Sequence, residues 1–146
     1  MQPLSVPPTD GDHVLGRLDA RVVIVEYGDY DCPHTRRAHG YLLQLLEESP
    51  GGLALVFRQF PLRHIHQNAQ KLAELTQAIS EPGTYWAAHQ ALMAERRMSL
   101  EVAERVLTGL GLDVAQLAAR SVAAALSVQA DVERGLRDGV HSTPSF

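Results

Sequence analysis

The feature that most constrains this fold is a run of β-branched residues that leads, through a short acidic bend, to the only cysteine of the chain. Residues 22–25 read Val-Val-Ile-Val, and the bend at residues 28–31 is followed by Cys32-Pro33. An unbroken apolar run of this kind predicts a strand buried on both faces, the central strand of an α/β sheet. After Cys32 the apolar residues recur at helical spacing. We therefore expect Cys32 where a strand passes into a helix.

A cysteine at the start of a helix has a particular chemistry. The first backbone N–H groups of a helix are unpaired and the helix dipole is positive there, so a thiolate is favoured over a thiol. Pro33 is consistent with this position, since proline is well tolerated in the first helical turn. A small buried hydrophobic residue is the alternative role of a free cysteine. We interpret Cys32 as a reactive thiol.

The segments that surround Cys32 form a recognisable set. Glu26 stands six residues before the cysteine, and the motif itself reads Cys-Pro-His-Thr. This set resembles the DsbA-like branch of the thioredoxin superfamily, whose thiol–disulfide oxidoreductases carry Cys-Pro-His-Cys. The resemblance extends to residues 12–16, 57–62 and 142–146. It implies an α/β, thioredoxin-like fold with an inserted all-helical domain.

Thr35 stands where the resembling family has its second, resolving cysteine. At three residues from Cys32 it is expected on the same helical face, where its hydroxyl can donate a hydrogen bond to a thiolate. It cannot attack a mixed disulfide, so an ordinary dithiol oxidase is not expected. Activity implies a monothiol cycle, in which Cys32 attacks a disulfide or becomes a sulfenic acid and glutathione or a partner cysteine resolves it. The alternative is a site that has lost its oxidoreductase function, or an engineered trapping variant.

The resemblance assigns roles to further residues. Protonated His34 would be a positive partner of the thiolate, and the alternative is a solvent-facing histidine without a role. Glu26 matches the buried acid that assists proton transfer, and the alternative is a strand-end glutamate paired with a base. Thr143-Pro144 would have a cis peptide bond opposite Cys32, its backbone open to an extended substrate, rather than an ordinary trans proline. The expected site comprises the catalytic residues Cys32, His34, Thr35 and Glu26 and the substrate-binding residues Pro33, Thr143 and Pro144.

Two other functions are alternatives to an oxidoreductase. One is a non-catalytic module that holds an extended peptide in a groove beside Pro144. The other is a metal site of His64 and His66 with His34, His39 or Cys32, but their spacing is a weak signal, and we expect no metal. No resident cofactor is expected, with glutathione as the candidate co-substrate.

Three arginines near the motif are open to two interpretations. Arg36, Arg37 and Arg63 form either a positive patch that attracts the carboxylates of glutathione or a solvated charged face. The expected partners are protein or small-molecule thiols and disulfides.

The length of 146 residues and a hydrophobic content of 45% suit one compact domain with one insertion. We expect an arm at residues 1–18, of which residues 1–11 are unpacked, and a thioredoxin-like domain at residues 19–62 and 126–146. Residues 63–125 form the helical insertion, and the stripe that contains Trp86 and His89 belongs to its core.

The end of the sequence departs from the resembling family. There, Thr-Pro is followed by a β-hairpin and a final helix, which do not follow Thr143-Pro144 here. We expect a native chain that continues beyond Phe146, because a strand that ends after two residues would leave the core uncovered. A chain that lacks these edge elements is the alternative.

Charge and hydropathy exclude several classes of partner. The net charge of −4 and the absence of a basic stripe argue against nucleic acid and anionic membrane surfaces. No apolar run approaches the roughly 18 residues of a membrane span, so membrane insertion is not expected. Residues 1–10 lack the charged and apolar regions of a secretory signal, and we therefore expect the cytosol.

Overall fold

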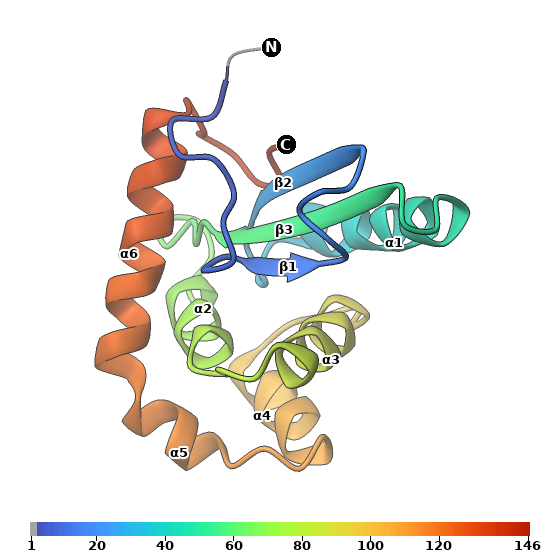
Figure 1. Cartoon of the computed structure of the whole chain (residues 1–146). Coiled ribbons are helices and arrows are strands. Elements are labelled where there is room, and N and C mark those ends of the chain that lie inside the picture. The colour runs from blue at the N-terminus through green and yellow to red at the C-terminus, as the bar shows by residue number, and fades with distance from the viewer. Residues whose placement is uncertain (1–2) are drawn as a thin grey trace.

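A three-stranded sheet lies at the centre of the computed structural model, which describes residues 3–146 (Figure 1). The strands are β1 (His13–Leu15), β2 (Val22–Gly28) and β3 (Leu53–Gln59), in the order β1-β3-β2. β2 and β3 are parallel, and β1 is antiparallel to β3. The helix between β2 and β3 completes the strand–helix–strand unit that the sequence predicts.

The central strand of the sheet is β3, and the prediction that the Val-Ile run occupies this place is wrong. Only β3 pairs with a strand on both sides within the described chain, whereas the outer edge of β2 pairs only through a bridge between Tyr27 and Ser145. Val22, at the start of the run, is 49% exposed. An apolar run reports β-propensity and burial, and it says nothing about strand order. The strand order also depends on β1, which has only three residues and is too short to show a hydrophobic pattern in the sequence.

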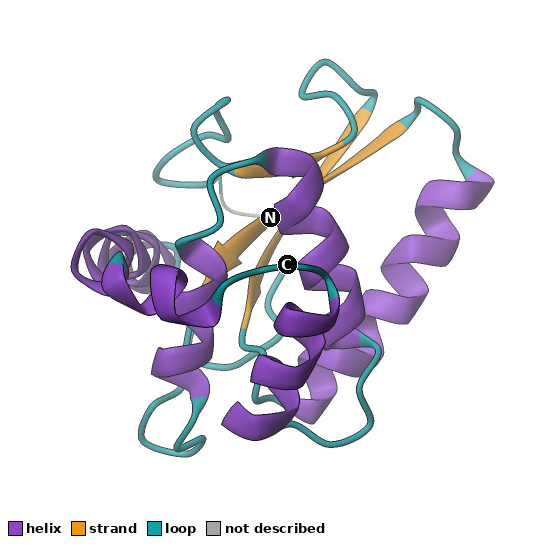
Figure 2. Cartoon of the chain, turned by 90° about the horizontal axis from the view of Figure 1, so that it is seen from below, coloured by secondary structure: helices purple, strands orange, loops and turns teal. Residues whose placement is uncertain are grey.

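Six helices make up most of the remaining chain. Their bounds are α1 (Pro33–Glu48), α2 (Ala69–Gln77), α3 (Pro82–Met93), α4 (Leu100–Gly109), α5 (Val114–Ala119) and α6 (Ser121–Arg137). Ser99 and Asp113 cap α4 and α5 by accepting from the N–H groups of Val102 and Gln116, as their sequence positions predict. The helices α2, α3 and α4 lie below the sheet in Figure 1 and therefore in front of it when the molecule is seen from below (Figure 2), and α6 runs along one side of the molecule (Figure 1).

The larger hydrophobic core is shared by the sheet and the helices. It joins Phe57 of β3 to Leu72 of α2, Leu92 of α3 and Leu107 of α4. The α3 stripe is buried in this core, as the sequence predicts. Trp86 in the stripe donates its indole N–H to the carbonyl of Val14 at 2.9 Å, which fastens α3 to β1. The sheet and the helices are therefore stabilised by the same apolar contacts.

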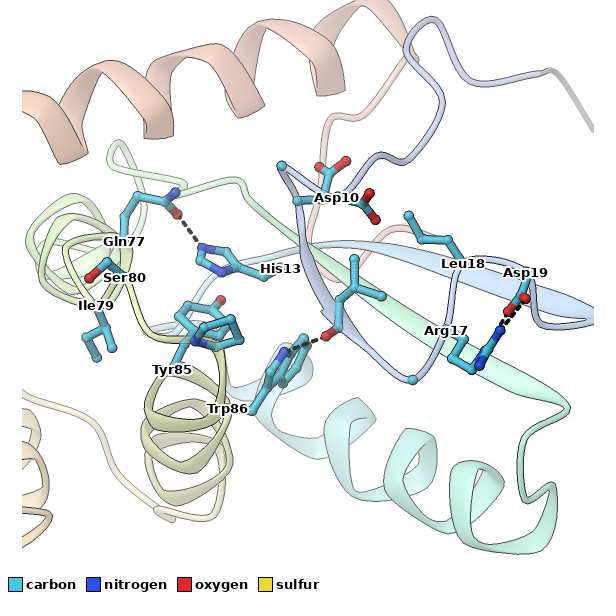
Figure 3. A pocket seen from close by; sticks show the side chains of 15 residues that line it. Asp10, His13, Arg17, Leu18, Asp19, Gln77, Ile79, Ser80, Tyr85 and Trp86 are labelled. Atoms are coloured by element: carbon cyan, nitrogen blue, oxygen red, sulfur yellow. Dashed lines mark hydrogen bonds and ion pairs between the residues drawn. The ribbon is translucent and has the colours of Figure 1, made fainter.

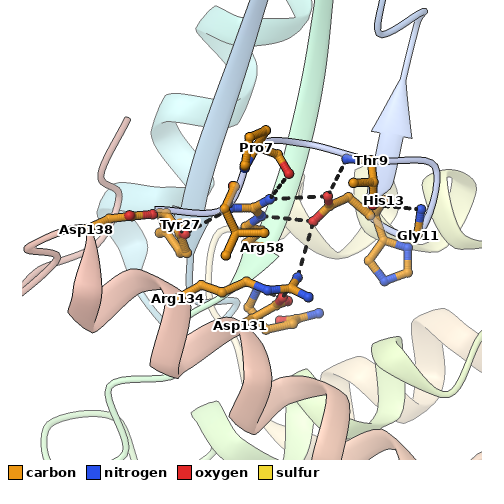
Figure 4. Close-up of polar contacts among 12 residues, drawn as sticks. Pro7, Thr9, Gly11, His13, Tyr27, Arg58, Asp131, Arg134 and Asp138 are labelled. Carbon is orange, nitrogen blue, oxygen red and sulfur yellow. Dashed lines mark hydrogen bonds and ion pairs between the residues drawn. The ribbon is translucent and has the colours of Figure 1, made fainter. Parts of the chain in front are cut away.

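The amino-terminal arm is packed, and the prediction that residues 1–11 are unpacked is wrong for residues 5–7. The fully buried Arg58 donates to the carbonyls of Val6 and Pro7 at 3.0 and 3.3 Å (Figure 4). The N–H of Ser5 donates to Asp138. A Pro- and Ser-rich composition does not reveal that a buried guanidinium on β3 requires acceptors, which the arm supplies. The first two residues lie outside the described chain.

Candidate active site

Cys32 lies at the junction of β2 and α1, where the sequence predicts it. Its backbone is extended and it occupies the N-cap position of α1, so Pro33 begins the helix. The N–H of Cys32 donates to the carbonyl of Asp29 at 3.1 Å, and its own carbonyl accepts from the N–H of Arg36 at 3.2 Å. The side chain is 3% exposed. These contacts fix the sulfur at the positive end of the α1 dipole.

The last residues of the chain lie against the sulfur of Cys32. Its Sγ donates to the carbonyl of Thr143 at 3.4 Å, and the Thr143–Pro144 peptide bond is cis. Ser145 exchanges two backbone hydrogen bonds with Tyr27, at 2.9 and 3.1 Å, and so holds this segment on the edge of β2. Thr143 and Cys32 are thus brought together from opposite ends of the sequence.

A buried carboxylate, which the sequence analysis missed, anchors the bend before Cys32. Asp29 is 2% exposed and accepts from the N–H groups of Asp31 and Leu62, at 2.8 and 3.0 Å, and from Nδ1 of His66 at 2.8 Å. These bonds join the cysteine loop to the segment that leads into α2. An aspartate next to glycine in a bend between strand and helix was the available signal, but its distant partners are visible only in the fold.

Thr35 is buried and does not orient the sulfur. Its Oγ1 accepts from the N–H of Asp29 at 3.4 Å, and across residues 3–146 the structure records no hydrogen bond between Thr35 and Cys32. The helical spacing rule behind the expected bond does not hold for Cys32, whose backbone is extended rather than helical. A Cβ placed on Gly28 would lie 2.9 Å from the Thr35 methyl carbon and 2.4 Å from the Phe57 ring. Thr35 therefore packs where β2 and β3 approach α1 closely.

Glu26 is a fully buried carboxyl group on β2. Neither of its side-chain oxygens has a hydrogen-bond partner in the described chain, and no ion pair involves it there. The alternative of a glutamate paired with a base is therefore wrong. Burial raises the pKa of Glu26 to about 8, so the group carries a proton at neutral pH.

The residues of the alternative metal site are not brought together. His34 and His64 are exposed, whereas His39 is buried with its ring 4.7 Å from that of His89. His66 is bound to Asp29. Among the described residues there is no group of three or more His, Cys, Asp or Glu side chains suited to hold a metal ion.

The three arginines near the motif have different environments. Arg36 donates to the carbonyl of Tyr30 at 2.8 Å and to that of Glu95 at 3.1 Å, so it joins the cysteine loop to the end of α3. Arg37 and Arg63 are exposed, on α1 and on the loop after β3.

The pocket drawn in Figure 3 lies between β1 and the helices α2 and α3, with a volume of about 660 Å³. His13 stacks on Tyr85 with 3.5 Å between ring centroids, and its Nε2 lies 3.0 Å from Oε1 of Gln77. Cys32 does not line this pocket. The candidate active site is the region around Cys32 and Thr143, which lies outside this pocket.

A family model described as Thioredoxin matches residues 8–146. The chain belongs to the thioredoxin family. Its fold is similar to that of oxidised BdbD from Bacillus subtilis (TM-score 0.77, 20% identity, 94% of this chain and 81% of that chain). It is also similar to alpha-DsbA1 from Wolbachia pipientis (TM-score 0.79, 19% identity, 94% and 74%). A thioredoxin-like oxidoreductase from Silicibacter pomeroyi is 30% identical (TM-score 0.75, 90% and 76%). The predicted DsbA-like thioredoxin fold is confirmed.

Curated relatives share the domain within much longer proteins. The chain is 35% identical over 149 residues to Na(+)/H(+) antiporter NhaA 1 of Salinispora arenicola and 31% identical over 148 residues to NhaA of Nitrosospira multiformis. It spans about a fifth of their length, 22% and 24%. The antiporter name describes those whole proteins. In residues 3–146, no helix combines the length and apolar character needed to cross a membrane.

Proposed function

We propose that this protein is a monothiol thiol–disulfide oxidoreductase whose nucleophile is Cys32. The observation that carries the proposal is the contact between the Cys32 sulfur, at the start of α1, and the Thr143 carbonyl beside cis-Pro144. Thr35 occupies the position of a resolving cysteine, and the chain has no other cysteine. A single sulfur at such a site can form a mixed disulfide, but an external thiol must release it.

The reaction follows from these groups. The Cys32 thiolate attacks one sulfur of a substrate disulfide, the substrate S–S bond breaks, and the departing thiolate takes a proton from solvent. A second thiolate then attacks the mixed disulfide and regenerates Cys32. We assign glutathione as this co-substrate.

The neighbouring residues have distinct parts in this proposal. When the Cys32 thiol loses its proton, the Thr143 carbonyl loses the donor that it now binds and becomes free to accept from the backbone of an extended substrate. Pro33 and Pro144 border this position. Exposed His34 supplies positive charge when protonated, and Glu26 serves as the buried proton carrier. Thr35 contributes packing.

The test is the intact mass of the reduced protein after brief exposure to oxidised glutathione at pH values from about 5 to 8, the range that brackets an activated thiol. We expect rapid addition of one glutathionyl group at the acid end, and none to Cys32→Ser. Addition that becomes measurable only as the pH approaches 8 would contradict an activated thiol.

Restoring the second sulfur provides a further test. In Thr35→Cys we expect insulin reduction by dithiothreitol to accelerate at least about tenfold over the unchanged protein, because an internal thiol can then release the mixed disulfide. Cys32→Ser/Thr35→Cys is the matched control and should show no acceleration. Equal rates in all three proteins would argue against an intact oxidoreductase site.

The burial of Cys32 and the lack of a resolving cysteine favour one second candidate, a peptide-binding module on the same fold. It would hold an extended peptide against Thr143 and Pro144 without chemistry. Slow glutathionylation of Cys32, together with no acceleration of insulin reduction in Thr35→Cys, would support this candidate.

A further inference from the structure

A hollow lined by arginines lies between the end of α3 and α4. Arg96 and Arg97 follow α3, and Arg105 lies on α4. With Glu95, Val102 and Ala94 they surround a space of about 610 Å³, which we call the arginine basin. Arg96, Arg97 and Arg105 are all exposed at its rim.

One side chain connects the arginine basin with the active site. Arg36 lies one turn after Cys32 on α1, and its guanidinium bonds the carbonyls of both Tyr30 and Glu95. Tyr30 belongs to the bend that carries Cys32, and Glu95 lines the basin. Arg36 therefore joins the bend that carries Cys32 to the segment that lines the basin.

The arginine basin is positive on a molecule whose net charge is −4. Within residues 3–146, no ion pair involves Arg96 or Arg97, and Arg105 approaches Glu95 only at 3.9 Å. Glu95 is the only acidic side chain among the residues that line the basin. Unpaired guanidinium groups bind carboxylates by charge-assisted hydrogen bonds, and clustered charges of one sign raise association rates.

We propose that the arginine basin binds an acidic segment of the polypeptide whose disulfide Cys32 attacks. The inference rests on the proposed function, since it names the substrate class of the same site. A polypeptide suits the geometry because an extended chain advances roughly 3.3 Å per residue and can occupy both the sulfur and the basin beyond Arg36. In the reaction, the Cys32 thiolate displaces one peptide thiolate from the substrate disulfide, and that thiolate takes a proton from solvent.

The test compares three symmetrical peptide disulfides that differ only in the segment that extends from cysteine toward the basin, which consists of aspartates, serines or lysines. The second-order rate constant for mixed-disulfide formation on Cys32 is measured by intact mass at neutral pH. At low salt we expect the aspartate peptide to react about tenfold faster than the serine peptide, and the lysine peptide to react more slowly. The preference should shrink in roughly 0.3 M salt, because the charges are exposed and screened.

Charge reversal in Arg96→Glu/Arg97→Glu should abolish the preference for aspartate and leave the serine rate within about twofold. Arg21→Glu/Arg120→Glu makes the same change of net charge at exposed positions outside the basin and should retain the preference. Equal rates for aspartate and serine peptides, or a preference that survives in Arg96→Glu/Arg97→Glu, would overturn the inference.

A binding measurement separates this inference from the proposed function. Cys32→Ser, which has no thiol, is titrated with a fluorescent aspartate-rich peptide that lacks cysteine, and anisotropy reports binding. Failure of the serine peptide disulfide to react overturns the proposed function. The titration then still tests, independently of any reaction, whether the basin binds an acidic peptide. Binding that depends on Arg96 and Arg97 supports the basin, and absence of binding overturns it.

Discussion

At the scale of single residues, Glu26 shows how burial sets protonation. The carboxyl lies on β2 without a hydrogen-bond partner in the described chain, and burial raises its pKa from 4.5 to about 8. An unfolded chain ionises Glu26 above pH 4.5, whereas the folded protein retains the proton until about pH 8. The folded state therefore binds more protons in this window, and stability decreases as the pH rises through it.

Replacement of Glu26 by glutamine should remove this dependence. Because one pKa unit corresponds to about 1.4 kcal/mol, we expect Glu26→Gln to raise the free energy of unfolding at pH 8 by a few kcal/mol, and to change it little at pH 4. Urea unfolding at several pH values measures the effect. The exposed Glu47→Gln is the matched control and should leave the pH dependence unchanged. A parallel pH dependence in Glu26→Gln and the unchanged protein would exclude Glu26 as its source.

The sequence predicted the place of Cys32 but not the contacts of Thr35. The strand and helix patterns on either side of the cysteine were strong, so their junction could be located. The role of Thr35 depended on Cys32 being helical, and its extended N-cap backbone turns the sulfur toward Thr143 instead. Contacts between residues so far apart in sequence, like those of Asp29 with His66, leave no local pattern.

At the scale of elements, the arm, β3 and α6 are joined by a network of charges around one buried ion pair (Figure 4). Nε of Arg58 lies 2.9 Å from Asp12, both side chains are almost fully buried, and Arg134 of α6 approaches Asp12 at 3.7 Å. Tyr27 of β2 accepts from Arg58 and donates to Asp138. Burial opposes ionisation of Asp12, but the hydrogen bonds from Arg58 and from the Thr9 N–H, together with the charges of Arg58 and Arg134, outweigh it and lower the pKa of this carboxyl.

Removal of one member of this network should be costly. Asp12→Ala leaves the Arg58 charge buried without its carboxylate, and we expect a loss of about 3–5 kcal/mol in the free energy of unfolding. Equilibrium urea unfolding measures it. The exposed neighbour Asp10→Ala should cost less than about 0.5 kcal/mol. In Asp12→Leu/Arg58→Met, which removes both charges, we expect most of the loss to be recovered; a double variant as unstable as Asp12→Ala would contradict this explanation.

Element prediction succeeded where patterns were long and failed where they were short. The two longer strands, the helix after Cys32 and the capped starts of α4 and α5 were visible in hydrophobic spacing and cap residues. β1 has three residues, and nothing in its composition marks it as a strand. Its place beside β3 depends on distant contacts that the sequence does not show. Arg58 donates to the carbonyl of Val6 in the arm, and Trp86 donates to the carbonyl of Val14 in β1.

At the scale of the whole molecule, the core that joins sheet and helices contains buried histidines. His89 is fully buried, with Nδ1 2.7 Å from the hydroxyl of Tyr30, and His39 lies beside it with both ring nitrogens unpartnered in the described chain. Burial lowers the pKa of His39 to about 4 and that of His89 well below its usual value. Both rings are therefore neutral in the folded protein at neutral pH.

The contribution of His39 to stability should therefore be lost in acid. Below pH 6.5 the unfolded chain protonates His39 while the folded protein does not until about pH 4, so this contribution is complete above pH 6.5 and is lost as the pH falls toward 4. We expect His39→Phe to reduce the loss of urea resistance between pH 7 and pH 4.5. His64→Phe, at an exposed position, is the control and should behave like the unchanged protein. The same acid loss in both variants would exclude His39 as a cause.

The shared core also contains an intrinsic fluorescent probe of folding. Trp86 is the only tryptophan, its ring meets Tyr85 and His89 edge-on at 5.3 and 4.9 Å, and its N–H is bound to β1. Emission from this one indole reports whether α3 remains seated on the sheet. Tyr85 in turn contacts Tyr30, which lies two residues from Cys32. Intrinsic fluorescence can therefore report the folding of the core near the site, while mass spectrometry reports the modification of Cys32.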